Sequence, residues 1–144
     1  MIVSFFGHSD FQNNGIYEKR LLSLIEKIDA PSLNFYLGGY GNFDNFTYSI
    51  CKNYKVNHNC KLVYITPYLN KNLQDYALKY DEIIYPALEN VPLKYSIVQR
   101  NKWIVDKSDY IFFYVSHTFG GAYRMLEYAK RKGKPFLNLY DYKP

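Results

Sequence analysis

Short apolar runs alternate with segments of helical periodicity along the whole chain. The clearest run is "YIFFYV" at residues 110–115, which is apolar at nearly every position. A strand that is buried on both faces of a parallel sheet has this pattern, because helices cover both of its sides. The segment at residues 16–28 instead places Leu21, Ile25 and Ile28 at spacings of four and three, which predicts an amphipathic helix.

The alternation continues from end to end and gives an expected order of elements. Strands are predicted at residues 2–6, 33–37, 61–66, 82–85, 110–115 and 135–140. Helices are predicted at residues 16–28, 42–53, 70–80, 92–108 and 120–134. This order predicts an α/β fold, a Rossmann-like three-layer sandwich in which helices flank a mainly parallel sheet with right-handed crossovers. No repeat or linker interrupts the series, so we expect one domain over residues 1–144.

In such a sheet, ligands bind beyond the carboxyl ends of the strands. The residues that directly follow the predicted strands are therefore the candidates for a binding site. They are Gly7, His8 and Ser9 after the first strand, Gly38, Gly39, Gly41 and Asp44 after the second, and His117, Gly120, Gly121 and Arg124 after the strand at 110–115. Two of these groups hold a Gly-Gly pair before a helix, where glycine permits close backbone approach and the helix N-terminus favours an anion.

Each of these candidates also has a purely structural alternative. The glycines after the second strand can form a tight turn alone, and their spacing differs from the G-x-G-x-x-G of dinucleotide-binding folds, so NAD in its usual pose is not expected. Asp44 can accept hydrogen bonds from ribose hydroxyls, or it can cap the next helix by accepting from an amide two or three residues later. His8, Ser9 and His117 can bind a ligand or cap their turns.

Two further candidates lie on predicted helices. Arg100 is placed inside an otherwise apolar-patterned helix, and its guanidinium suits bidentate binding of phosphate or carboxylate. The alternative is an exposed surface arginine. Glu127 follows the second Gly-Gly pair, and its carboxylate can act as an acid, a base or a ribose ligand, or it can be solvated.

The net charge of +5 raises the question of nucleic-acid binding. The cations are scattered, however, and the densest run, "KRKGKP" at residues 130–135, is typical of a helix C-terminus. Basic residues in the last turn favour the helix dipole, Gly133 suits the position after the cap, and Pro135 prevents continuation. Charge therefore does not favour a nucleic-acid partner.

The remaining composition gives expectations about metals, cofactors and location. Cys51 and Cys60 have no metal-ligand spacing, and the three histidines have no pattern of a metal site, so we expect ordinary thiols, no metal and no cofactor. No apolar run approaches the length of a membrane span, and the N-terminus lacks the features of a signal peptide. We expect a cytoplasmic protein that has no membrane partner.

The run "SIVQRNKWIVDKSDYIFFYVSHTFGGAYRMLEYAKRKGK" resembles the SLOG superfamily. This superfamily unites the LOG phosphoribohydrolases, often called lysine decarboxylase-like, the DprA and Smf proteins, and a group of small stand-alone Rossmann-like proteins. "QRNKWI" is similar to the E-R-K-x-x-M segment of LOG enzymes, and "GGAYRMLE" is similar to their P-G-G-x-G-T-x-x-E. With "FFGHSD" and "LGGYGNFD", the resemblance to the stand-alone group covers nearly the whole chain.

The resemblance implies that a nucleotide or nucleotide-derived molecule, such as an ADP-ribose-like ligand, is bound or sensed at the predicted edge. LOG enzymes cleave the N-glycosidic bond of nucleoside 5′-monophosphates, and their catalytic arginine and glutamate map onto Arg100 and Glu127. An N-glycosidic hydrolase or a deoxyribosyltransferase is therefore the alternative function. Phe119 replaces the motif proline, and Tyr123 and Arg124 replace its Gly-Thr, so a bulky pair stands where LOG enzymes bind phosphate, and Arg124 adds a cation there.

Two further expectations rest on kinship with other members of the superfamily. Single-stranded DNA binding is a third candidate function, by analogy with DprA. This expectation rests on the fold and the positive charge alone. Relatives often dimerise through helices, so the resemblance also allows a homo-oligomer.

Overall fold

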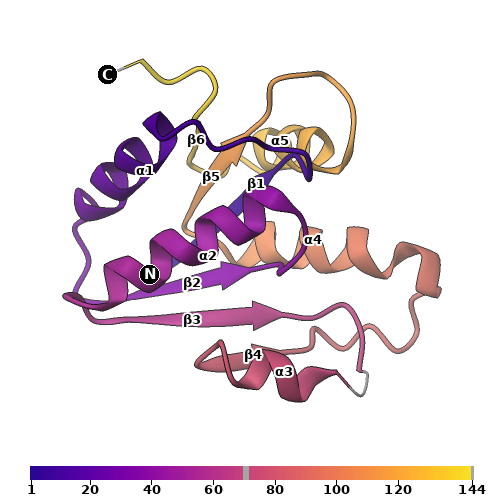
Figure 1. Cartoon of the computed structure of the whole chain (residues 1–144). Helices are drawn as coiled ribbons and strands as arrows, with labels where there is room; N and C mark the ends of the chain where they lie inside the picture. The colour runs from indigo at the N-terminus through magenta and orange to yellow at the C-terminus, as the bar shows by residue number, and fades with distance from the viewer. Residues whose placement is uncertain (70–71, 144) are drawn as a thin grey trace.

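The computed structural model describes residues 1–69 and 72–143 (Figure 1). Its strands are β1 (Ile2–Gly7), β2 (Leu33–Leu37), β3 (Cys60–Ile65), β4 (Glu82–Ile84), β5 (Tyr110–Tyr114) and β6 (Phe136–Asn138). Its helices are α1 (Ile16–Glu26), α2 (Asn42–Lys55), α3 (Leu73–Ala77), α4 (Ser96–Lys107) and α5 (Gly121–Arg131), with a 3-10 turn η1 at Leu93–Tyr95. The strands form one six-stranded sheet in the order β4-β3-β2-β1-β5-β6, and every pairing is parallel. The predicted fold class is confirmed.

Two hydrophobic cores lie on opposite faces of the sheet. Leu21 and Ile25 of α1 and Phe43 of α2 pack with Phe35 of β2 on one face. On the other face, α4 and α5 contribute Ile104, Val105, Met125, Leu126 and Ala129 to a core with Ile111 and Phe113 of β5. Figure 1 shows the resulting layers, with α1 and α2 on one side of the sheet and α4 and α5 on the other. The alternating side chains of β5 enter both cores, which explains its nearly continuous apolar sequence.

The predicted elements are all present, with small differences in their bounds. The helix predicted at 70–80 is confined to Leu73–Ala77 within the described residues, and residues 70 and 71 of that prediction lie outside them. The helix predicted from 92 begins instead as η1 and becomes α-helical at Ser96. The helix predicted to reach residue 134 ends at Arg131, and Gly133 follows the cap with φ +67°, which is the conformation expected of a glycine that ends a helix.

The strand order reverses between β1 and β5, and this reversal decides where a ligand can bind. The chain leaves β1 toward α1 on one face and leaves β5 toward α5 on the other face, so the two loops separate above the sheet. Such a switch point opens a crevice at the carboxyl ends of the strands. In Figure 1, α4 projects beyond the arrowheads of β2 and β3, so its first turns overhang this edge.

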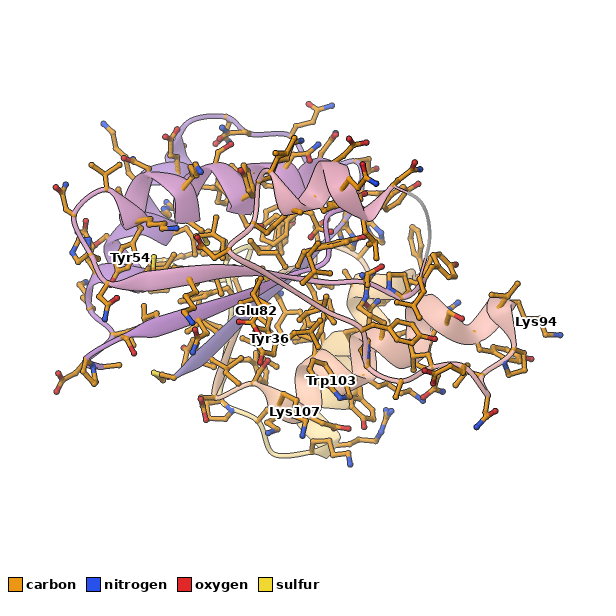
Figure 2. The ribbon with its side chains drawn as sticks, turned by 90° about the horizontal axis from the view of Figure 1, so that it is seen from below. Tyr36, Tyr54, Glu82, Lys94, Trp103 and Lys107 are labelled. Carbon is orange, nitrogen blue, oxygen red and sulfur yellow. The ribbon has the colours of Figure 1, made fainter. Side chains whose placement is uncertain are left out.

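The packing of α4 beneath β2 fixes that overhang. The ring of Tyr36 on β2 stacks on Trp103 of α4 with 5.9 Å between centroids and an angle of 6°, and Figure 2 shows both side chains under the sheet near Glu82 of β4. Burial, and the nearby Glu82 carboxylate, raise the pKa of the Tyr36 hydroxyl. Lys107 lies one turn beyond Trp103, with its ammonium 5.8 Å from the indole. The stack of Tyr36 on Trp103 joins β2 to α4 and helps to set the position of α4 relative to the sheet.

The structure also bears on the cysteines and on the membrane. Cys51 and Cys60 are both free thiols and both are buried, as the sequence predicts. In the part of the chain that the structure describes, no helix combines the length and the apolar character that a membrane crossing needs.

Candidate functional site

A pocket of about 490 Å³ opens at the carboxyl edge of the sheet, around the end of β1. Its walls come from the end of β1 and the loop after it, the turn after β2, one face of α4 and the loop that joins β5 to α5. Most of the residues predicted from the sequence line it, namely Gly7, His8, Ser9, Gly38, Asp44, Arg100, His117, Gly120 and Gly121. Segments more than 100 residues apart thus meet at the switch point between β1 and β5.

Arg100 extends from α4 to the ends of β2 and β3. Its Nη1 donates to the carbonyl of Ile65 at 2.7 Å and to the carbonyl of Gly38 at 3.3 Å. Its Nε donates to Oδ1 of Asn101 at 2.8 Å. The residue is 5% exposed, so the interpretation as an exposed surface arginine is wrong. Burial lowers the pKa of the guanidinium, and the nearby Asp44 carboxylate opposes that shift.

Asp44 lies in the first turn of α2, close to Arg100 across Gly38. Its Oδ2 accepts from the N–H of Tyr40 at 2.9 Å, an amide four residues earlier, so the predicted cap of an amide two or three residues later is wrong. Burial raises the pKa of the Asp44 carboxyl to about 6, although the Tyr40 amide and the Arg100 guanidinium both favour the ionised form. A side chain at Gly38 would place its Cβ 3.3 Å from this oxygen and 3.5 Å from Nη2 of Arg100. Gly38 therefore keeps the space beside both charges open.

An aromatic column forms the opposite side of the pocket. His8, 7% exposed, accepts through Nε2 from the N–H of Ser116 at 3.0 Å, so its neutral ring carries the proton on Nδ1. The ring of His8 stacks on that of His117 at 3.6 Å and 9°, and His117 contacts the ring of Phe119 at 3.9 Å and 30°. Burial, and then the neighbouring His117, lower the pKa of His8.

The N-terminus of α5 follows this column directly. Gly120 adopts φ +91°, a left-handed backbone that favours glycine, and Gly121 begins the helix. The first intrahelical bond runs from the N–H of Arg124 to the carbonyl of Gly120 at 3.1 Å, so the amides between these residues have no partner within the helix. Gly120, Gly121 and Ala122 line the pocket. These amides and the positive end of the helix dipole suit an anion.

Four of the predicted site residues do not line the pocket. Gly39 packs against the ring of Tyr64, where an added Cβ would lie 2.7 Å from a ring carbon, and Gly41 is the N-cap of α2 beside Ser9. The other two lie on α5, where Arg124 is exposed and Glu127 pairs with Lys130 on the surface at 3.4 Å. The structure therefore does not bring Glu127 onto the pocket wall with Arg100, as the mapped catalytic pair requires.

Sequence reasoning also missed several lining residues. Tyr40 and Phe119 are 79% and 68% exposed and both line the pocket. The pocket is also lined by Phe5, Phe6, Asp10, Ile97, Asn101, Ile104 and Ala122. A signal was present for the two aromatic residues, because each stands inside a strand-to-helix loop next to a glycine.

The site has the character of a pocket for an organic ligand. Within residues 1–69 and 72–143, no group of three or more His, Cys, Asp or Glu side chains is arranged to hold a metal ion. Arg100 and Asp44 lie on one part of the wall and the rings of His8, His117 and Phe119 on another, so a ligand with one polar and one aromatic part matches the walls.

Comparison with known proteins assigns no family to the chain. No protein-family model matches its sequence, and no curated protein matches it.

Proposed function

We propose that this protein binds or senses a nucleotide or a nucleotide-derived molecule, such as an ADP-ribose-like ligand, in the pocket at the carboxyl edge of the sheet. The observation that carries the proposal is the placement of Arg100. Its guanidinium is buried and fixed by two backbone carbonyls and by Asn101, and it lines the pocket. A buried cation that is preorganised in this way is suited to hold a phosphate by charge-assisted hydrogen bonds.

Other features of the pocket agree with a nucleotide. The amides at the start of α5 offer a second site for phosphate oxygens. Asp44 is an acceptor for ribose hydroxyls beside Arg100. The volume of about 490 Å³ falls within the range of roughly 300–1,000 Å³ that small-molecule sites occupy. The resemblance of the sequence to SLOG proteins supports the same ligand class.

Calorimetric titration with AMP and with ADP-ribose tests this proposal. We expect Arg100→Ala to weaken binding by roughly 1.5–3 kcal/mol, because a charge-assisted contact to phosphate is lost. Arg124→Ala is the matched control, since it removes the same charge from an exposed position outside the pocket. Arg100→Lys keeps a cation at the site. It shows whether the loss of affinity in Arg100→Ala comes from the missing contact to phosphate or from damage to the fold.

Two results would contradict the proposal. The first is that neither AMP nor ADP-ribose binds the wild-type protein. The second is that Arg100→Ala and Arg124→Ala weaken binding equally, because long-range charge alone would then explain the effect.

Asp44 supports a second candidate, hydrolysis of an N-glycosidic bond. Its pKa of about 6 suits a carboxylate that takes a proton near neutral pH. In this reaction the bond between C1′ and the base breaks, and the base leaves with the electron pair. Water attacks C1′ while Asp44 takes one of its protons, and the base then receives a proton from solvent as Asp44 releases its own to solvent.

Release of adenine from AMP distinguishes this enzyme from a binding protein. We expect Asp44→Asn to abolish release, because the amide cannot take the proton of water. Glu127→Gln should leave the rate unchanged, since Glu127 lies on the surface with Lys130. A wild-type protein that binds AMP without releasing adenine would exclude the enzyme and retain the binding function.

A further inference from the structure

The rings of His8, His117 and Phe119 form a continuous column that ends at the mouth of the pocket. The centroid separations of 3.6 Å and 3.9 Å are those of rings in face contact. A ring has two faces, and two neighbours this close cannot share one of them. His117 therefore lies between the other two rings, and Phe119 is the outer end of the column.

The column is anchored at its inner end and open at its outer end. The hydrogen bond from Ser116 to Nε2 fixes the ring of His8 at the end of β1. His8 is 7% exposed, whereas Phe119 is 68% exposed. His117 thus covers one face of the Phe119 ring and fixes the position of that ring. Much of the ring remains in contact with solvent. Both His117 and Phe119 line the pocket.

The polar groups of the pocket belong to the same lining as this ring. Phe119 directly precedes Gly120 and Gly121, which begin α5 and present its unpaired amides. Arg100 and Asp44 lie beside Gly38 and also line the pocket. A flat group on Phe119 can therefore be joined to an anionic group at the α5 amides or at Arg100. The rings of the column carry no charge when both histidines are neutral, so they suit an uncharged aromatic group.

We propose that Phe119 is the stacking platform for the base of the ligand, with the anchored His117 and His8 rings behind it. This inference rests on the proposed nucleotide site and adds the position of the base within it. Stacking on a ring face tolerates different bases, because every base has such a face. The site should then favour nucleotides over sugar phosphates while discriminating weakly among bases.

Calorimetry with AMP and with ribose 5-phosphate separates the base from the rest of the ligand. We expect Phe119→Ala to weaken AMP binding by about 5- to 150-fold, the range for loss of one base stack, and to leave ribose 5-phosphate binding unchanged. Phe119→Tyr should retain the affinity for AMP. Tyr95→Ala is the control, because it removes a half-exposed ring on η1 that does not line the pocket. In Phe119→Trp, AMP should quench the fluorescence of the new indole.

The outcomes separate this inference from the proposed function. If the wild-type protein binds AMP and Phe119→Ala binds it equally well, the platform is wrong and the nucleotide site stands. If Phe119→Ala weakens the binding of AMP and of ribose 5-phosphate equally, the ring contributes to binding of the sugar phosphate or to the structure of its loop. The platform is then also wrong. If neither nucleotide nor ribose 5-phosphate binds the wild-type protein, the proposed function and the platform both fail.

Discussion

The pocket has two dissimilar halves, one charged and one aromatic. The charged half consists of Gly38, Asp44 and Arg100, at the ends of β2 and β3 and on the overhanging part of α4. The aromatic half is the column of His8, His117 and Phe119, on the loops that follow β1 and β5. Each half is built from segments that only the sheet topology brings together. The first half holds a guanidinium and a carboxyl group and the second holds stacked rings, and the proposed nucleotide has a matching polar part and aromatic part.

The two halves respond to pH in opposite directions. The pKa of Asp44 is raised from 3.8 to about 6 in the folded protein, so its contribution to stability is complete below 3.8 and is lost as pH rises toward 6. The pKa of His8 is lowered from 6.5, so its contribution is complete above 6.5 and is lost as pH falls below that value. Near pH 6 the two effects oppose each other, and variants of each half are needed to see them separately.

The largest effect is expected from removing the cation of the charged half. Arg100→Ala leaves the carbonyls of Gly38 and Ile65 without their donor and leaves the Asp44 carboxylate without a nearby cation. We expect a loss of roughly 2–4 kcal/mol in the free energy of unfolding, since each unsatisfied buried group costs about 1–3 kcal/mol. Urea denaturation at pH 7 measures it.

Lys107→Ala on the same helix is the control for Arg100→Ala. Lys107 is exposed, so its removal should change the free energy of unfolding by about 0.5 kcal/mol or less. Equal losses in the two variants would show that Arg100 contributes no more than a surface cation, and the charged half would lose its structural basis.

The next effect concerns the pH dependence of the charged half. The difference between a pKa of 3.8 and one of about 6 corresponds to at most about 3 kcal/mol of stability. Relative to Asp44→Asn, the wild-type protein should therefore become less stable as pH rises from 4 to 6. Urea denaturation at several pH values gives this difference. If the free energies of unfolding of the wild-type protein and of Asp44→Asn changed equally with pH over this range, the carboxyl of Asp44 would have an ordinary pKa.

A smaller effect is expected in the aromatic half. His117→Leu keeps an apolar cover over His8 but removes the neighbouring imidazole, which is one cause of the lowered pKa of His8. The pKa of His8 should therefore rise, and NMR titration of its ring protons measures the shift. His58→Leu is the control, because His58 stacks on Tyr54 far along the chain from the column. A pKa of His8 that falls or stays constant in His117→Leu would show that the two rings are not electrostatically coupled.

The sequence predicts the sheet well because the local pattern and the fold agree. The apolar run at 110–115 is read correctly as a doubly covered strand, since its side chains enter both cores. The edge at which the pocket lies follows from the strand-to-helix order, so most of the predicted lining residues are found there. These predictions depend on hydrophobic periodicity and on the order of strands and helices, and both can be read from the sequence.

The contacts between loops cannot be predicted from the sequence in this way. The burial of Arg100 depends on the overhang of α4, which the stack of Tyr36 on Trp103 helps to set. The contact of His8 with His117 joins positions 109 residues apart, and Phe119 can only be assigned a role once that contact is known. Local sequence has no signal for such contacts, because they depend on how the helices pack on the sheet.

The smallest effect is expected at Glu127, where the resemblance to LOG enzymes and the structure point in different directions. Met125, Leu126 and Ala129 form the buried stripe of α5, and Glu127 lies off that stripe, where it pairs with Lys130. A partly exposed pair of this kind contributes about 0–1 kcal/mol, so Glu127→Gln should leave both the free energy of unfolding and the affinity for AMP almost unchanged. Asp44→Asn, measured beside it by calorimetry, is the variant expected to alter binding. A Glu127→Gln protein that lost AMP affinity while Asp44→Asn kept it would place the functional carboxylate on α5, and the charged half would then have to be redefined around Glu127.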